Sequence, residues 1–180
     1  MSDTEGRRLA AAARLLGFLL QRELDEDAVA ELRRGGVEPA LEALGLALPP
    51  EGDTAALEAL AAEYFERFVA PRDTPPLVHS LAEGGGYEGE PAAGVRNVAA
   101  QLGVARDEDA ARGAPVDHLG SELELWAEVR LRAPDQASDF ARAYLAWSAP
   151  ILRQQSGHGG FYGRLSGVVA EFVETVSAPD

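Results

Sequence analysis

Residues 115–126 read P-V-D-H-L-G-S-E-L-E-L-W and hold the densest group of chemically informative side chains in the sequence. Pro115 has the fixed φ angle that suits the first position of a helix, where its missing N–H group is not needed. Asp117 would then lie in the first turn, where a carboxylate meets unpaired N–H groups and the positive end of the helix dipole. The stretch therefore predicts a helix that begins at Pro115 and ends before Pro134.

One face of this predicted helix is apolar and carries side chains spaced three and four apart, which predicts a buried stripe of Val116, Leu119, Leu123, Trp126 and Ala127. His118 and Glu122 are four apart, as are Asp117 and Ser121, so that each pair could touch on the helix surface. We therefore expect an Asp-His pair at the start of the helix, above a run of acidic residues, Glu122, Glu124 and Glu128.

Length and composition indicate one globular domain. The chain has 180 residues, 46% of them apolar, which is enough for one sizeable core and short for two, so we expect residues 1–180 to form a single domain. There is no cysteine, which excludes disulfides, a thiol nucleophile and a zinc ribbon. The formal net charge of −14 repels phosphate backbones and anionic membranes, so neither nucleic acid nor membrane insertion is expected. The excess of acid favours a cationic partner, or serves solubility alone.

The rest of the chain predicts helices and no strands. Helices are expected at 5–23, 25–34, 38–46 and 92–102, and from Phe161 to Val176. A further helix should start at an Asp53 cap and end near residue 70. Another should start at an Asp135 cap and run through Ile151, with a kink or break near Pro150. No period-two alternation persists for more than a few residues. The fold class is therefore predicted to be all-α, a single-domain bundle of about seven or more helices.

Two loops interrupt this pattern. Residues 71–91 form a long Pro/Gly-rich stretch, which Leu77 and Val78 should anchor to the bundle as an ordered loop. Residues 106–114 are expected to form a polar, acidic loop.

The N-terminus contains Arg7-Arg8 before an apolar run and so superficially resembles a twin-arginine export signal. Arg14 interrupts that run, and no small-residue cleavage site follows it, so we expect a core helix and a cytoplasmic protein.

The sequence offers little support for catalysis or for a cofactor. Its three histidines lack the spacing of a metal site, its glycine run lacks a Walker lysine, and there is no G-x-S-x-G motif. We therefore expect no metal, no cofactor and no enzymatic activity. An enzyme that uses Asp117 and His118 as an acid/base pair is the competing interpretation.

Asp117 and His118 allow two interpretations. Asp117 could cap its own helix while His118 is a satisfied, half-buried polar residue. Alternatively, Asp117 and Glu122 hold a cationic group of a partner, because Arg pairs with carboxylates in a bidentate way. An apolar groove rimmed by acids would suit a peptide with a basic end and an apolar body. The aromatic residues Tyr64, Phe65 and Phe68 are expected to be core.

Several motifs resemble one known family. The stretch 115–126 resembles the P-x-D-H-x-x-x-E-L-E signature of the TorD/DmsD-type cytoplasmic chaperones, or redox-enzyme maturation proteins. Tyr64 to Phe68 with Pro75-Pro76 resembles the family's Y-x-x-L-F…P-P segment, although Leu77 stands where an aromatic is common. Residues 87–91 (Y-E-G-E-P), 145–150 (L-x-W-x-x-P) and 161–162 (F-Y) match in order and spacing, and the resemblance spans roughly residues 9–173.

The resemblance implies an all-helical chaperone that binds the twin-arginine leader of a molybdopterin oxidoreductase in its apo form and assists cofactor insertion before export. Asp117 and His118 carry over from the signature as leader-binding residues, with Pro76, Leu77 and Phe68 from the proline-rich segment, and Glu122 joins them from the acidic face argued above. A related nitrate-reductase-type assembly chaperone is the alternative within the same resemblance. Family members form monomers or homodimers, and both states stay open.

Overall fold

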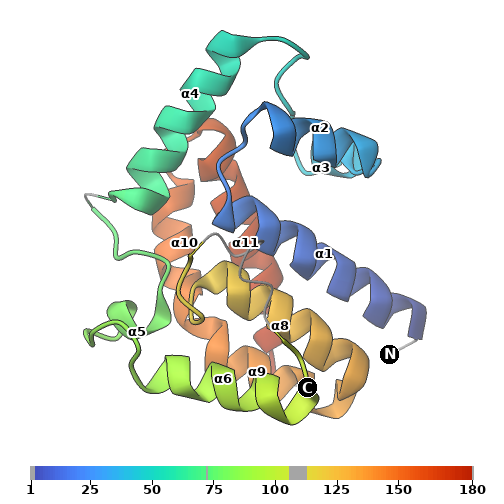
Figure 1. Ribbon diagram of the computed structural model, residues 1–180, viewed down its shortest axis with the longest axis vertical. Helices are drawn as coiled ribbons and strands as arrows, with labels where there is room; N and C mark the ends of the chain where they lie inside the picture. The colour runs from blue at the N-terminus through green and yellow to red at the C-terminus, as the bar shows by residue number, and fades with distance from the viewer. Residues whose placement is uncertain (1–2, 72, 106–112, 180) are drawn as a thin grey trace.

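The computed structural model describes residues 3–71, 73–105 and 113–179. Within these ranges the fold is all-α, as predicted, and more than seven helices are present (Figure 1). Along the chain they are α1 (Asp3–Gln21), α2 (Glu26–Arg34), α3 (Glu38–Ala43), α4 (Thr54–Tyr64), α5 (His79–Ala82), α6 (Glu90–Leu102), α8 (Leu119–Arg132), α9 (Ala137–Tyr144), α10 (Ala149–Ser156) and α11 (Gly160–Ser177). The described residues form no strand, and one isolated bridge joins Val78 to His118.

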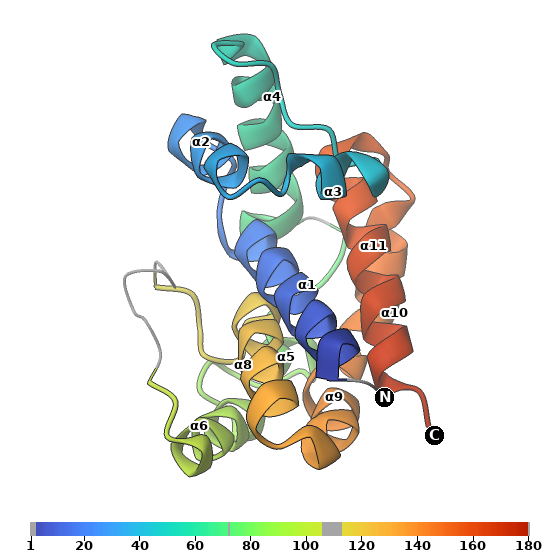
Figure 2. The ribbon, with the colours of Figure 1, turned by 90° about the vertical axis from the view of Figure 1, so that its right-hand side faces the viewer.

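Helices α1 and α8 lie side by side and form the centre of the lower part of the molecule (Figures 1 and 2). Two glycines allow this close approach. A Cβ atom added at Gly17 would lie 2.7 Å from the carbonyl oxygen of Gly120, and one added at Gly120 would lie 2.8 Å from that of Gly17. Because real Cβ atoms do not approach backbone oxygens so closely, the spacing of the two helices depends on both residues being glycine.

The other helices surround this pair. Figure 2 shows α2, α3 and α4 at one end, α6 and α9 at the other, and α10 and α11 along one side. Trp126 of α8 packs edge-on against Phe172 of α11, with ring centroids 5.4 Å apart. The Tyr162 hydroxyl accepts a hydrogen bond of 3.0 Å from the backbone N–H of Leu24, which ties α11 to the segment between α1 and α2.

Most predicted helix boundaries are confirmed within two or three residues. Asp25 and Asp53 cap α2 and α4 by accepting bonds from Ala28 N (2.7 Å) and Ala56 N (3.0 Å). Gly103 ends α6 in the left-handed conformation, at φ +63°.

The helix predicted from Pro115 is the main correction, because α8 begins at Leu119. His118 is its N-cap, and its Nδ1 accepts a bond of 3.1 Å from Gly120 N. Asp117 therefore lies before the helix, and the prediction that it sits on the N–H groups of its own first turn is wrong. The predicted stripe remains buried from Leu119 to Ala127, while Val116 is half-buried.

Three further differences come from local geometry. The helix predicted up to residue 70 ends as an α-helix at Tyr64 and continues as a π-helix, Phe65–Val69, in which Phe65 is 56% exposed and not core. Asp135 caps no helix but lies in a short 3₁₀ turn. The predicted break near Pro150 is confirmed, because α9 ends at Tyr144 and Pro150 occupies the first turn of a separate helix, α10. The stretch 71–91 contains the short helix α5 and is not one uninterrupted loop. The predicted loop 106–114 falls for the most part outside the described residues.

No helix in the described ranges combines the length and the apolar character needed to cross a membrane.

Candidate functional site

The proline-rich segment docks against the start of α8 through its backbone. His79 N donates to the carbonyl oxygen of Asp117, and Leu119 N donates to that of Leu77, both at 2.9 Å. The Leu77 and Val78 side chains are 1% and 5% exposed. The expectation that these two residues anchor the segment to the bundle is confirmed.

Asp117 is fully buried and faces α5. Its Oδ2 accepts bonds from Ser80 N at 2.9 Å and from Ser80 Oγ at 2.5 Å. Its Oδ1 is buried without a hydrogen-bond partner in the part of the chain that the structure describes. The carboxylate thus satisfies an N–H group in the first turn of a different helix, which fixes α5 to the residues that precede α8.

Glu122 is also fully buried and binds two aromatic side chains from distant segments. Its Oε1 lies 3.0 Å from His79 Nδ1, and its Oε2 accepts a bond of 2.9 Å from Trp147 Nε1. The His79 and Trp147 rings stack at 4.9 Å between centroids. We call Asp117, Ser80, His79, Glu122 and Trp147 the clasp, because together they join α5, α8 and the turn before α10.

Burial sets the protonation of the clasp. It raises the pKa of Glu122 to about 7, in spite of the hydrogen bond and the charge of His79, which favour the ionised form. Burial lowers the pKa of His79, but the hydrogen bond and the negative charge of Glu122 outweigh that effect, so the net shift of the His79 pKa is upward. The pair therefore keeps a proton to a higher pH than the two separate side chains would.

The six residues predicted to bind a leader occupy different environments. Asp117 and Glu122 are 0% exposed, Leu77 is 1% and Phe68 is 9% exposed, while Pro76 and His118 are half-buried. The structure brings Leu77, Asp117, His118 and Glu122 together where the loop meets α8. Phe68 packs instead against Tyr64 and Tyr162, with ring centroids 5.4 and 5.5 Å away.

The predicted pairing along the helix is replaced by contacts between helices. Glu122 binds His79, and Ser121 Oγ donates to Gln21 Oε1 at 3.1 Å. Because Asp117 has no exposed surface, it cannot touch a substrate in this conformation, and the acid/base interpretation of Asp117 and His118 has no open site here.

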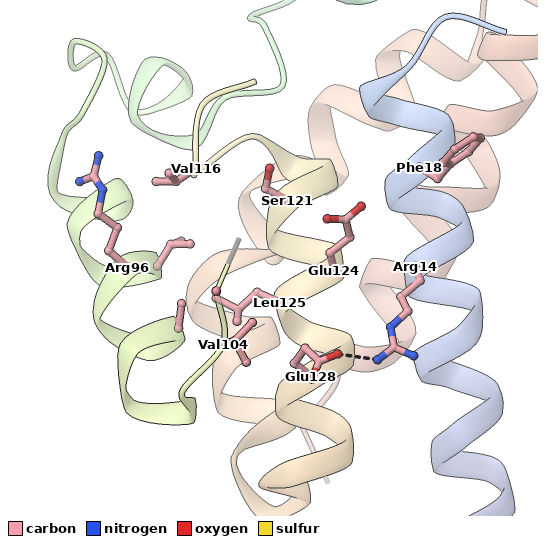
Figure 3. A pocket seen from close by; sticks show the side chains of 12 residues that line it. Arg14, Phe18, Arg96, Val104, Val116, Ser121, Glu124, Leu125 and Glu128 are labelled. Carbon is pink, nitrogen blue, oxygen red and sulfur yellow. Dashed lines mark hydrogen bonds and ion pairs between the residues drawn. The ribbon is translucent and has the colours of Figure 1, made fainter. Parts of the chain in front are cut away.

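A groove lies beside the clasp, with α8 in the middle and α6 and α1 on either side (Figure 3). It encloses about 570 Å³ and is lined mainly by apolar surface. Its lining comes from α1 (Arg14, Phe18), α6 (Val95, Arg96, Ala99), α8 (Ser121, Glu124, Leu125, Glu128) and the connecting residues Val104, Ala105 and Val116. We call this the α1–α6–α8 groove.

The α8 residues of the groove follow helical spacing, at i, i+3, i+4 and i+7 from Ser121. Leu125 faces α6 across the apolar half, whereas Glu124 and Glu128 face α1 (Figure 3). Glu128 Oε1 accepts a bond of 2.5 Å from Arg14 of α1, and Oε2 pairs with Arg132 at 2.8 Å. Glu124 accepts a bond of 3.0 Å from Gln21.

The sequence predicted the acidic face of α8 but not the other walls of the groove. Arg14, Phe18, Val95 and Leu125 belong to helices far apart in the chain, and no local spacing connects them. The contacts of His79 and Trp147 with Glu122 were not predicted, for the same reason. The one feature of the sequence that marks these two residues is that each lies near a proline.

No group of three or more histidine, aspartate or glutamate side chains gathers in metal-binding geometry within residues 3–71, 73–105 and 113–179.

The protein-family model described as nitrate reductase delta subunit matches residues 27–156, well over half of the chain. This family comprises chaperones of molybdoenzyme maturation, not enzymes. The matched range includes the clasp and most of the groove, but not α1. No curated protein and no solved structure matches the chain.

Proposed function

The chain belongs to the nitrate reductase delta subunit family, whose members are redox-enzyme maturation chaperones of the NarJ/TorD type, and from that premise we propose what it binds and where. It is a cytoplasmic, single-domain chaperone that holds the N-terminal leader of a molybdopterin oxidoreductase in its apo form, before export. The client's leader carries two adjacent arginines and an apolar segment. The apolar segment lies in the α1–α6–α8 groove, beside the acids of α8.

The observation that carries this proposal is the composition of the groove. A segment bound there would bury its apolar side chains against Phe18, Val95 and Leu125 and would place cationic side chains beside Glu124 and Glu128. Amphipathic peptides bind helical proteins through apolar anchors in such grooves. The net charge of −14 adds a long-range attraction for a cationic peptide.

The clasp supports the groove from behind. Glu122 lies on the same helix as the groove residues Ser121, Glu124 and Leu125 and within three positions of each, so the clasp fixes the helix that forms the groove floor. Of the six leader-binding residues predicted from the sequence, only Pro76 and His118 reach the surface. We propose that these two contact the leader at the edge of the site, and that the four buried ones act by holding the site in shape.

The test is calorimetry with a synthetic twin-arginine leader, against the same peptide with both arginines changed to lysine. We expect a Kd of about 10 µM or tighter for the arginine peptide and weaker binding of the lysine peptide, since only guanidinium forms bidentate bonds with carboxylates. Leu125→Arg, which places a charge in the apolar half of the groove, should abolish binding. The exposed Leu131→Arg on the same helix is its control, because Leu131 does not line the groove.

A nitrate-reductase-type assembly chaperone would recognise a different client through the same groove. A second arm therefore uses the N-terminal peptide of a nitrate reductase catalytic subunit. Binding of that peptide alone would identify the alternative client, and failure of both peptides to bind would contradict the proposal.

A further inference from the structure

Arg14 already occupies the position that a bound arginine would need. It lies on α1 at the wall of the groove, and its guanidinium donates to Glu128 Oε1 at 2.5 Å (Figure 3). The Arg14 side chain is 47% exposed and Glu128 is 21% exposed, so the guanidinium lies at the water boundary while the carboxylate lies deeper. The Glu128 carboxylate in the groove is therefore already paired with a guanidinium group of the same chain, that of Arg14.

Both acids on this face accept bonds from α1. Glu128 uses both carboxylate oxygens in ion pairs, one with Arg14 and one with Arg132. Glu124, one turn earlier, accepts a bond of 3.0 Å from Gln21 Nε2. Arg132 Nε bonds from within α8 at i+4 and does not line the groove, whereas Arg14 bonds across from the facing helix and does. Among the described residues that line the groove, Arg14 is the cation that pairs with an acid of α8, whereas Arg96 on the α6 wall pairs with Glu88.

We propose that Arg14 is a built-in competitor for the leader: a leader arginine replaces it on Glu128, and Arg14 turns into solvent. The inference rests on the proposed function and names the regulation of that same groove. The exchange conserves the number of ion pairs, so the arginine contact contributes to specificity, and the apolar segment provides most of the affinity.

Physical magnitudes favour such an exchange. A half-exposed ion pair contributes little to stability, so Arg14 leaves at small cost. The apparent affinity of a site is reduced by the fraction of molecules in which it is open, and the Arg14–Glu128 pair lowers that fraction. Removing the competitor should therefore tighten leader binding about 2- to 5-fold.

The test compares Arg14→Gln with Arg7→Gln, using the full-length protein and a synthetic twin-arginine leader in calorimetry. Arg7 lies on the same helix, is exposed and pairs with Asp3, four positions earlier, at 3.0 Å. Its loss therefore removes the same charge at a position that does not line the groove. We expect Arg14→Gln to bind the leader about 2- to 5-fold more tightly than wild type. Arg7→Gln should bind like wild type or only slightly more tightly, because the loss of one distant positive charge adds little to the long-range attraction.

Two further arms separate competition from general charge. A leader with both arginines changed to glutamine should lose the gain seen with Arg14→Gln, because it has no guanidinium to place on Glu128. Glu128→Gln should weaken binding more in the Arg14→Gln protein than in wild type, where the carboxylate is already occupied. Arg14→Lys, which keeps the charge, should bind with wild-type or intermediate affinity.

Each outcome decides the matter. Unchanged or weaker binding by folded Arg14→Gln, with wild type binding normally, overturns the competitor and leaves the proposed function standing. A gain of equal size in Arg7→Gln also overturns it, since the effect would then be long-range charge. Absence of leader binding in wild type and in all variants overturns both proposals, and binding that appears only in Arg14→Gln supports both.

Discussion

His79 Nδ1 lies 3.0 Å from the Glu122 carboxylate, and the side chains that make this contact are 5% and 0% exposed. The two residues are 43 positions apart in the chain, so the pair fixes the proline-rich segment to α8. Further groups surround it. Glu83 Oε1 lies 3.4 Å from His79 Nε2, Trp147 donates to Glu122, and the charge of Asp117 raises the pKa of Glu122.

This pair makes stability fall as pH rises. The folded-state pKa of Glu122 is raised from 4.5 to about 7, and that of His79 is raised above 6.5, so over this range the folded pair holds more protons than the unfolded chain. The stabilisation is complete at low pH and is lost as pH rises through about 7. Urea unfolding of wild type and of Glu122→Gln between about pH 5 and pH 8 measures this pH-dependent stabilisation. The free energy of unfolding of the wild type should fall relative to that of the variant as pH increases.

Glu174→Gln is the matched control for that experiment. Glu174 is an exposed acid whose pKa is lowered by its hydrogen bond with Arg153, so its contribution is lost only as pH falls below 4.5. The free energy of unfolding of Glu174→Gln should run parallel to wild type between about pH 5 and pH 8. A wild-type curve parallel to that of Glu122→Gln would show that the pair does not retain its proton.

Asp117→Asn distinguishes a structural role from a role in leader binding. Asparagine keeps one oxygen for Ser80 but replaces a charge-assisted bond by a neutral one, so we expect the free energy of unfolding to fall by about 1–3 kcal/mol. The leader affinity of the folded protein should stay within about 2-fold of wild type. Asp139→Asn, at an exposed residue of α9, is the control for loss of one negative charge.

A loss of leader affinity without a loss of stability in Asp117→Asn would indicate that Asp117 contacts the leader directly. An affinity loss of about 1–3 kcal/mol with unchanged stability would mean that the segment before α8 opens and that Asp117 pairs directly with a leader arginine. Calorimetry at a temperature well below the unfolding midpoint separates the two readouts.

Local signals predicted the helices and their caps well, but contacts between segments decided the site. Pro115 favours a helix start, yet α8 begins only at Leu119, because residues 117–119 pair with 77–79 instead. Phe65 has the spacing of a core residue, but it is the first residue of the π-helix and is exposed, while Phe68 in the same π-helix is buried. Neither effect is encoded in the spacing of nearby residues.

The acids of the candidate site illustrate the same limit. The sequence placed Glu122, Glu124 and Glu128 on one helix, and the structure confirms that. Their roles differ because their neighbours differ: Glu122 faces His79 inside the core, whereas Glu128 faces Arg14 at the groove. Only the packing of α1 and α5 against α8 separates a structural carboxylate from a surface one.

Trp147→Phe tests the second hydrogen bond to Glu122. Phenylalanine retains most of the ring that stacks on His79 but removes the indole N–H, which leaves a buried carboxylate oxygen without its donor. We expect a loss of about 1–3 kcal/mol in the free energy of unfolding, larger at high pH, where Glu122 is ionised. Tyr87→Phe, which removes a hydroxyl from a 68% exposed ring, should leave stability unchanged. A loss independent of pH would indicate that the Trp147 contribution is packing alone.

Gly17→Ala tests whether the spacing of α1 and α8 sets both the stability and the shape of the groove. The added Cβ would lie 2.7 Å from the Gly120 carbonyl oxygen, so the two helix backbones must separate, at a cost of about 1–3 kcal/mol. Gly167→Ala in α11 is the matched control, because its nearest neighbour would be Ser156 Cβ at 3.5 Å, and alanine there should stabilise the helix by about 0.5–1 kcal/mol. Since α1 carries Arg14 and Phe18, the separation should also weaken leader binding in Gly17→Ala and leave it unchanged in Gly167→Ala. Equal stability of the two variants would show that α1 shifts along α8 without cost, and that Gly17 does not fix the spacing of the two helices.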